Sequence, residues 1–486
     1  MTDQGMQSRF SRFLFAIAIG GLFHFSGAVA FAQDGDAGNP TQWIVRESKH
    51  LRLASDVNEP ELLEDLTQSF DAAVPQWLAF WGMPESRLKN WKIDGYLMRN
   101  VDAFRERGAL PASITPFRHG FSSPGTIWVR YQDTRYYNRH LVLHEGVHSL
   151  AFELFGAGGP SWFMEGTAEL LALHRERVIV PKRLSPESEE PARTLLAQSM
   201  DPFTINQFPR NRADTPGWGR YKIVARDRDA NSLPTLKSVL KLPMELNGKV
   251  EAYTWCWAAA SLFSQAPESR EAFLKAASRG SDQSEAFTSE FYRDVAEDWP
   301  VLSARWRLLL NDLDYGFDWS RHRIALSTSD PRATGAPVEM RVSSDQAWHS
   351  TGQWFPRGAR LRFAVSGQCQ VTTDWTSGPA GISIEFHRGA PLGQLQVCVL
   401  PIASPDQGTL PPMQIQSVIT KTDVARQIAS GNSDADAVDS LVIQGTQEVL
   451  IREPSWVLLR INLPIDHQPI ASDSALGYQV KVVPVR

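Results

Sequence analysis

Two histidines four residues apart, with a glutamate next to the first of them, form the most informative pattern in the chain. On a helix, the segment HEGVH (144–148) would place both imidazoles on one face. Two such rings can bind one Zn²⁺ at about 2 Å each, and the glutamate can then act as a general base toward water at the metal. The pattern predicts a hydrolytic zinc site, with His144 and His148 as ligands and Glu145 as the catalytic base.

A second acidic segment supplies the third protein ligand that a catalytic zinc needs, since such a metal keeps its fourth position open. Glu165 follows His148 by seventeen residues, at the start of the run SWFMEGTAELLALHRER (161–177), which is predicted to be helical. Glu169 lies one turn further on the same face, where we expect it to accept a hydrogen bond from a liganding imidazole and fix its tautomer. The alternative is two unrelated helices with exposed glutamates and surface histidines.

A third histidine, His140, precedes His144 by one helical turn. A row of three histidines spaced four apart spans about 12 Å of helix, too far for all three to bind one ion. Pairing His140 with His144 would leave Glu145 badly placed and Glu165 unused. We therefore interpret His140 as a packing residue or as a partner of the ligands.

The elements that must position these residues are predicted from apolar spacing. Residues 136–155 contain no proline and place apolar side chains at helical intervals, which predicts a buried helix. Gly146 is a poor helix former, and close backbone approach in a packed site would account for it. Further helices are predicted from Glu59-Pro60 to about Gly82 and over 251–265, and strands over 43–54, 91–98 and 126–131.

The segments HEGVH and PSWFMEGTAEL resemble the peptidase-MA-like gluzincins, which share H-E-x-x-H, a short connection and a W-x-x-E-G-x-A-E helix. The resemblance extends upstream to GFSSPGTIWVRYQD (120–133) and downstream to EAYTWCWAAASLF (251–263), and it covers about residues 45–315. It matches an uncharacterised bacterial branch of that family. It implies an α+β zincin-like domain, in which a mixed sheet accompanies the zinc-binding helices, and a peptide or protein substrate.

The same resemblance implies roles for residues outside the two metal-binding segments. The phenol of Tyr253 would stabilise an oxyanion, with Tyr221 as the backup and an ordinary core or rim tyrosine as the alternative. Residues 126–131 would be an edge strand that lines the cleft, to which an extended substrate adds by main-chain hydrogen bonds. Residues 176–250 are interpreted as a variable insertion, with a lid or a cleft wall as the alternative.

The N-terminal residues 1–32 have the pattern of a signal peptide. Arg9 and Arg12 precede a mostly apolar run that ends in Ala30-Phe31-Ala32, a small-x-small cleavage signal. We predict an extracytoplasmic protein, either periplasmic or secreted. The alternative is an uncleaved membrane anchor, because the apolar run approaches spanning length. The net charge of −5 offers no basic footprint for nucleic acid, so no nucleic-acid partner is expected.

From about residue 325 the chain becomes rich in strand patterns, beginning with RIALST (323–328), and predicts an all-β sandwich or barrel interrupted by a polar stretch at 404–448. Residues 347–367, GPAG (378–381) and the terminal ALGYQVKV resemble the jelly roll of bacterial galactophilic lectins, which implies Ca²⁺ and a glycan as ligands. Asp466 and Asp473 are available, but the Asn-rich signature is absent, so we expect a structural accessory sandwich instead. Cys369 and Cys398 could pair in an oxidising compartment.

With 486 residues, the sequence predicts a multidomain protein. The prediction is a signal peptide (1–32), a gluzincin-like metallopeptidase domain (42–320) and a β-sandwich accessory domain (326–486) with a loop insertion at about 404–448. The predicted activity is that of an exported zinc metallopeptidase. The alternatives are a non-catalytic zinc-containing protein that binds carbohydrate at a surface, and a gluzincin that acts on a non-peptide substrate.

Overall fold

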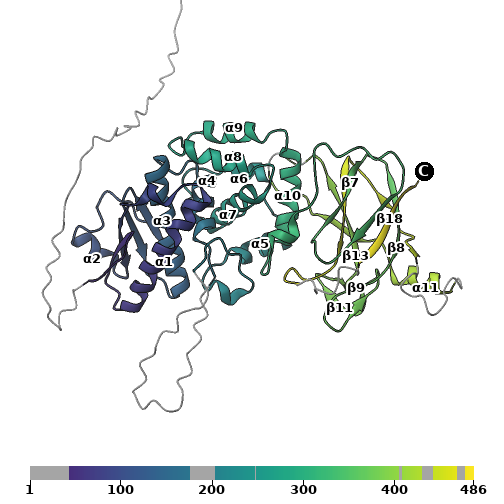
Figure 1. Cartoon of the computed structure of the whole chain (residues 1–486), viewed down its shortest axis with the longest axis horizontal. Coiled ribbons are helices and arrows are strands. Elements are labelled where there is room, and N and C mark those ends of the chain that lie inside the picture. Colours follow the sequence, from purple (N-terminus) through teal and green to yellow (C-terminus); the bar gives the residue numbers. More distant parts are fainter. Residues whose placement is uncertain are drawn as a thin grey trace, which may run out of the picture. The chain divides into compact units, whose positions relative to one another are not determined.

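A mixed α/β region precedes a β-rich C-terminal region in the chain (Figure 1). The computed structural model describes residues 43–175, 203–246, 248–403, 405, 408–429, 442–467 and 477–485. The predicted signal peptide lies outside these ranges. Residues Trp43–Arg486 belong to one compact unit, and the division into two domains near residue 320 stays a prediction.

The first sheet has five strands in the order β1-β2-β3-β5-β4. Its strands are β1 (Ile44–Glu47), β2 (Leu51–Ser55), β3 (Ile93–Met98), β4 (Gly120–Ser123) and β5 (Thr126–Arg130). The pairs β2–β3 and β3–β5 are parallel, and β1 and β4 add antiparallel at the two sides. The prediction that residues 126–131 form the edge was therefore wrong: β5 is paired on both sides, and β4, joined to it by a tight turn, is the edge strand.

Helices α1 (Pro60–Phe80) and α3 (Arg135–Phe155) confirm the two longest helices predicted from the sequence. Helix α3 begins where Thr134 accepts a hydrogen bond from the Tyr137 amide, and it ends at Gly156, whose φ of 80° is left-handed. Gly146 lies against the Phe70 ring of α1, and a Cβ built at Gly146 would collide with that ring. The glycine that weakens α3 locally thus allows the helix that contains HEGVH to pack closely on α1.

Helix α4 (Ser161–Ala172), which contains Glu165 and Glu169, is shorter than the predicted run to residue 177. Leu173 turns into extended backbone, and His174 pairs with Ile205 in an isolated β-bridge. Residues 174–177 read HRER, with neither glycine nor proline, so the sequence contains no stop signal at the end of α4. Helix α4 packs on α7 (Val250–Gln265), which agrees with the helix predicted over 251–265.

Gly166 lies at a close contact between α4 and α7, and its substitution tests the packing of the two helices. A Cβ at Gly166 would lie 2.5 Å from the carbonyl oxygen of Cys256, which is backbone and cannot rotate away. We expect Gly166→Ala to destabilise the fold by about 1–3 kcal/mol, as overpacked cores do. Urea unfolding measures this. Gly378→Ala is the control because nothing lies within 4 Å of its Cβ position, and equal loss in both variants would contradict the expectation.

The remaining described helices extend the α-rich part of the chain, apart from α11 near the C-terminal strands. They are α2 (Val101–Glu106), α5 (Arg220–Asp229), α6 (Leu236–Leu240), α8 (Arg270–Ala276), α9 (Glu285–Asp294), α10 (Trp299–Asp312) and α11 (Lys421–Ala429), with 3-10 turns η1 (Glu85–Leu88), η2 (Arg212–Asp214), η3 (Ala277–Arg279) and η4 (Trp319–His322). The core around α4 and α7 is unusually aromatic, with buried Trp162, Trp257 and Phe263 among its members. This core fixes α4, and with it both acidic residues of the predicted site.

The C-terminal strands form two larger antiparallel sheets and two short hairpins. One sheet has the order β14-β13-β17-β7 and the other β15-β8-β18-β6, with β16 also paired to β8. Their bounds are β6 (Val338–Val342), β7 (His349–Phe355), β8 (Arg360–Ser366), β13 (Leu395–Pro401), β14 (Gln414–Ser417), β15 (Ile443–Gln444), β16 (Val449–Leu450), β17 (Ser455–Ile461) and β18 (Tyr478–Val485). The hairpins are β9 (Cys369–Gln370) with β10 (Thr376–Ser377), and β11 (Ile382–His387) with β12 (Ala390–Leu392). Both large sheets contribute to one core, as in a β-sandwich.

Helix α10 and the strands share a second, smaller core. Val301 and Leu308 of α10 pack with Trp348, Trp456 and other residues of the β-rich region. Residues 323–328 lie at this junction without forming a strand, contrary to the prediction; Ile324 and Leu326 are buried there, and that burial produced the strand-like pattern.

Asp312, at the end of α10, makes charged contacts across the junction between α10 and the strands. Its carboxylate accepts hydrogen bonds from Trp348 at 2.7 Å and from Arg460 at 3.3 Å. Burial disfavours its ionised form, but the His322 hydrogen bond and the Arg460 charge outweigh burial and hold the pKa of Asp312 below its usual value. The α-rich and β-rich parts are thus joined by a buried, charged contact as well as by apolar packing.

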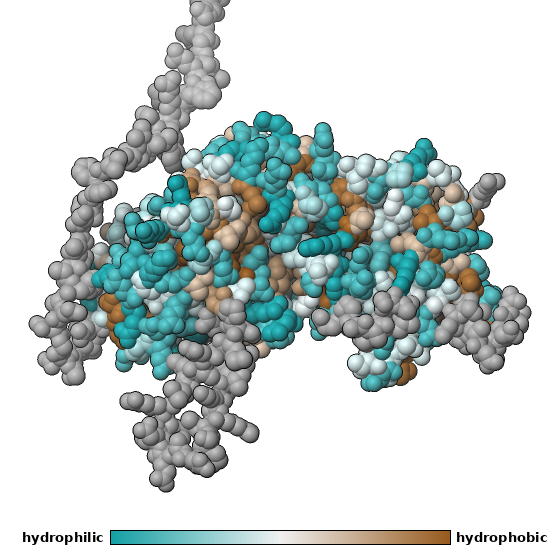
Figure 2. Space-filling view, viewed as in Figure 1, coloured by the Kyte–Doolittle hydropathy of each residue, from teal (hydrophilic) through white to brown (hydrophobic). Residues whose placement is uncertain are grey.

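The visible surface is mainly hydrophilic, with apolar residues in small groups between polar ones (Figure 2). Within the described ranges, no helix combines the length and the apolar character needed to cross a membrane. Cys256, Cys369 and Cys398 are all buried, and none of them is in a disulfide. The disulfide left open by the sequence, between Cys369 and Cys398, is therefore not formed in this structure.

Candidate metal centre

The imidazoles of His144 and His148 and the carboxylate of Glu165 converge on one point. Nε2 of His144 lies 3.1 Å from Nε2 of His148, and the Oε2 atom of Glu165 lies 3.1 Å and 3.3 Å from these two nitrogens. All three side chains are largely buried. The structure therefore brings together the three residues that the sequence predicted as metal ligands, from two helices that pack against each other.

This donor set fits a divalent metal. A tetrahedral ion with bonds of about 2.0–2.1 Å separates its ligand atoms by about 3.3–3.4 Å, close to the observed spacings. Burial alone would raise the pKa of Glu165, but the charge of His148 and the hydrogen bonds of both histidines outweigh burial and hold that pKa at about 2. The carboxylate is therefore ionised, as a ligand must be. The buried His and Glu side chains can hold a metal ion.

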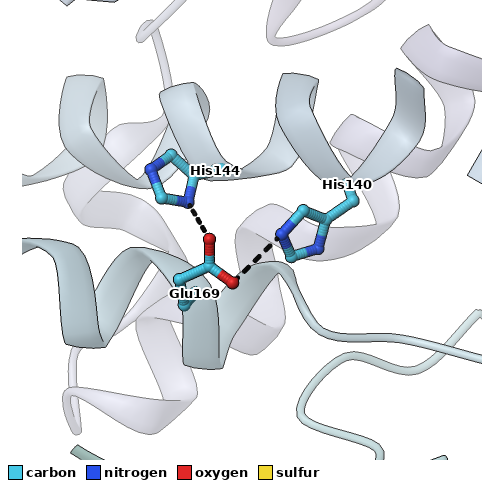
Figure 3. A group of neighbouring side chains, drawn as sticks. All are labelled: His140, His144 and Glu169. Atoms are coloured by element: carbon cyan, nitrogen blue, oxygen red, sulfur yellow. Dashed lines mark ion pairs between the residues drawn. The ribbon is translucent and has the colours of Figure 1, made fainter. Parts of the chain in front are cut away.

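Glu169 organises the opposite side of His144. Figure 3 shows its carboxylate on α4 between the rings of His140 and His144 on α3, with Oε2 3.4 Å from Nε2 of His140 and Oε1 3.5 Å from Nδ1 of His144. A proton on Nδ1 of His144, directed at Glu169, leaves Nε2 with a free lone pair for the metal. His140 is fully buried beside this carboxylate, in keeping with its interpretation as a partner of the ligands.

His140, His144 and Glu169 also lie close enough to hold a metal by distance alone. Both oxygens of Glu169, however, already accept hydrogen bonds: Oε1 from Arg220 at 2.6 Å, and Oε2 from Arg220 and Trp218 at 3.2 Å each. Burial opposes ionisation of Glu169, yet the Arg220 guanidinium outweighs it and holds the pKa of Glu169 well below its usual value. N–H donors and a guanidinium repel a cation. We therefore interpret His140 and Glu169 as a hydrogen-bonded support for the group formed by His144, His148 and Glu165.

Trp218 and Arg220 are the functional residues that sequence reasoning missed. They lie in GWGRYK (217–222), inside the stretch interpreted as a variable insertion. Arg220 and Val250 line the cleft at the candidate metal centre. The described part of residues 176–250 therefore forms a cleft wall, which was the alternative to a variable insertion. The available signal was a tryptophan and an arginine on either side of a glycine. Nothing in the local sequence relates these two residues to Glu169, about fifty residues earlier.

Glu145 faces the same cleft from α3 and lies against the edge strand. Gly120 of β4 touches its carboxylate, so that a Cβ at Gly120 would collide with the end of the Glu145 side chain. Ser122, on the same strand, gives it a hydrogen bond. Burial raises the pKa of Glu145 to about 7, and the nearby Glu165 carboxylate adds to this, while His148 and Ser122 oppose it. A carboxylate with a pKa near neutrality is suited to exchange protons.

Gly120→Ala tests whether β4 positions Glu145. The clash is with a flexible side-chain end and not with backbone, so we expect Glu145 to move and the fold to persist. Misplacing a catalytic group by about 1 Å can lower the rate by about 10²-fold. Hydrolytic turnover, the activity that the sequence predicts for this site, should therefore fall while the unfolding midpoint changes little. Full activity in Gly120→Ala would show that this contact has no catalytic role.

The centre opens into a cleft of about 700 Å³. Tyr253 of α7 lines this cleft, and its ring centroid lies 6.3 Å from that of His144. Burial and the carboxylates of Glu165 and Glu145 raise the pKa of Tyr253 well above its usual value, so its phenol stays protonated and able to donate. Tyr221 is buried in the aromatic core and is not among the residues that line the cleft. The structure thus places Tyr253, and not the backup Tyr221, at the centre.

The β-rich region offers no comparable cluster in the ranges that the structure describes. Asp466 belongs to neither of the metal-compatible groups found there, and Asp473 lies outside those ranges. Calcium and glycan binding by this region stay predictions of the lectin resemblance.

Known proteins give no direct indication of what the His-Glu cluster does. No protein-family model matches the chain, and no curated protein matches it at a significant level. What this centre does must therefore be argued from its geometry.

Proposed function

We propose that this protein is a zinc-dependent hydrolase of the gluzincin type that cleaves peptide bonds. The observation that carries the proposal is the convergence of Nε2 of His144, Nε2 of His148 and Oε2 of Glu165 within 3.1–3.3 Å of one another, beside the carboxylate of Glu145. Two imidazoles and one carboxylate suit zinc, and three protein ligands leave a position open for chemistry.

Zinc, when bound, supplies a Lewis acid that makes water nucleophilic near neutral pH and polarises a carbonyl group. Glu145 takes a proton from the attacking water on its carboxylate and passes it to the nitrogen of the leaving amine. The phenol of Tyr253 donates a hydrogen bond to the oxygen on which negative charge develops. Ser122 and Gly120 hold the Glu145 carboxylate, and Glu169 orients the His144 ring.

The shape of the cleft supports an extended polymer as substrate. Its lining includes residues 120–122 of β4, an edge strand to which an extended chain can add by main-chain hydrogen bonds. The aromatic side chains Phe117, Phe121 and Tyr253 line it together with the charged Arg118. The signal-peptide pattern of residues 1–32 places the protein outside the cytoplasm in this proposal. We therefore propose a peptide or protein substrate that the enzyme meets there.

The proposal is tested by incubating the zinc-loaded chain with a mixed peptide library and identifying new termini by mass spectrometry. We expect cleavage that disappears when zinc is chelated and returns when zinc is restored. A chain that carries zinc but cleaves no peptide in a diverse library would refute the peptidase assignment. Hydrolysis of ester or amide model substrates in the same sample would then indicate a gluzincin with a non-peptide substrate.

A further inference from the structure

Arg307 on α10 is a buried cation that has no hydrogen-bond or ion-pair partner among the residues that the structure describes. Its exposed fraction is 4%, and within those ranges neither Nε nor Nη1 has a hydrogen-bond partner. Burial lowers the pKa of this guanidinium, and the longer-range attraction of Glu453, which is exposed, opposes that only in part. Arginine nevertheless stays charged in proteins, and burying an unpaired charge is strongly unfavourable. Within the described ranges no carboxylate pairs with this guanidinium, and an anionic ligand would compensate its charge.

Arg307 lines a pocket of about 180 Å³. Its polar lining comes from Arg228 of α5, which neighbours α10 (Figure 1), and from Arg307 and Asn311 of α10. Its apolar lining comes from Leu233 and the segment 410–413. At about 30 Å³ for each water, the volume corresponds to only a few waters. The pocket therefore suits a small molecule with one charged end and one apolar end.

The walls of this pocket are held by hydrogen bonds between distant segments. The Leu410 amide donates to the Leu233 carbonyl at 2.7 Å, and Pro234 and Thr409 form an isolated β-bridge. Arg228 donates to the Asn311 carbonyl at 3.0 Å and lies 3.6 Å from the Asp314 carboxylate. Of the two arginines at the pocket, Arg228 already has protein partners, and Arg307 is the one whose charge is uncompensated.

We propose that this pocket binds a small carboxylate with a short apolar group, paired through the guanidinium of Arg307. Nε and Nη1 are each exposed by less than 1 Å², so Nη2 is the nitrogen of Arg307 that can donate a charge-assisted hydrogen bond to a carboxylate oxygen in the pocket. The apolar side chains of Leu410, Pro411, Pro412 and Met413 favour a hydrocarbon group over a fully hydrated inorganic anion. The proposal is independent of the metal centre, because none of these residues lines the metal-site cleft.

Titration of the full mature chain with 3-methylbutanoate tests this site, by calorimetry or ligand-observed NMR. We expect saturable binding that weakens by about tenfold to a hundredfold in Arg307→Gln, the range for a lost charge-assisted hydrogen bond. Arg305→Gln is the matched control, because Arg305 lies on the same helix but pairs with Glu268 at 2.7 Å and lines a different cavity. Its affinity for 3-methylbutanoate should equal that of the wild type.

Two further probes keep the test decisive even if Arg307→Gln fails to fold. The neutral isostere 3-methylbutanamide should bind the wild-type chain much more weakly than the carboxylate, and equal binding would overturn the role of the charge. Inorganic phosphate should compete poorly, and preferential phosphate binding would overturn the assigned ligand class. Carboxylate binding of equal strength in Arg307→Gln, or none to the wild type, would overturn the site. None of these binding results would bear on the proposed peptide hydrolysis.

Discussion

Glu145→Gln is expected to abolish peptide hydrolysis while the chain keeps its metal. The amide occupies nearly the same volume in the contact with Gly120, but it cannot accept the proton of the attacking water. General-base catalysis contributes about 10²–10⁴-fold, so turnover should fall by at least that factor. Both quantities are measured on one preparation: the initial rate of peptide cleavage, and zinc content by atomic spectroscopy.

The matched control for this experiment lies on the same helix. Glu153 of α3 is exposed, so Glu153→Gln makes the same chemical change away from the cleft and should leave the rate unaltered. A Glu145→Gln variant with full activity would refute the mechanism. Loss of zinc along with activity would instead show that Glu145 helps to hold the metal, which the arrangement of ligands does not predict.

Arg220→Met is expected to cause the largest loss of stability among the changes considered for this chain. It leaves the Glu169 carboxylate charged and buried, without its guanidinium partner and with only Trp218 and the rings of His140 and His144 beside it among the described residues. Breaking a buried ion pair from one side typically costs about 3–5 kcal/mol. The free energy of unfolding, measured in urea on the metal-depleted chain, should drop by that order.

A double variant separates the ion pair from simple packing. Arg220→Met combined with Glu169→Gln removes both charges, so it should recover much of the stability lost in Arg220→Met alone. Arg226→Met, an exposed position on the same helix, should leave stability essentially unchanged. If the double variant is as unstable as the sum of its single changes, Arg220 acts through packing and not through its charge.

The local elements around the site were predictable because their patterns are local. The spacing in HEGVH and the apolar periodicity of 136–155 place His144 and His148 on one helical face, and α3 has those bounds to within one residue. The run that begins at Ser161 likewise gives α4 and both glutamates. Tyr253, supplied by the family resemblance, does lie at the cleft, although its role there stays a proposal.

The parts that could not be predicted depend on contacts between distant segments. Nothing in the sequence near Arg220 indicates its ion pair with Glu169, because the two residues meet only when α5 packs behind α4. The edge position of β4 depends on which strand lies beside β3, a choice set by the whole sheet. Residues 323–328 carry a strand-like pattern because Ile324 and Leu326 fill the junction core, and burial alone does not distinguish a strand from an extended loop.

The metal content of the purified mature chain, measured beside the His148→Ala variant, tests the central claim most directly. The arrangement of His144, His148 and Glu165 predicts about one zinc per chain. Removing one of three ligands should lower the affinity enough that His148→Ala is isolated without metal. A wild-type chain that is free of zinc under conditions that preserve bound metals, or a His148→Ala variant that retains it in full, would contradict the metal centre.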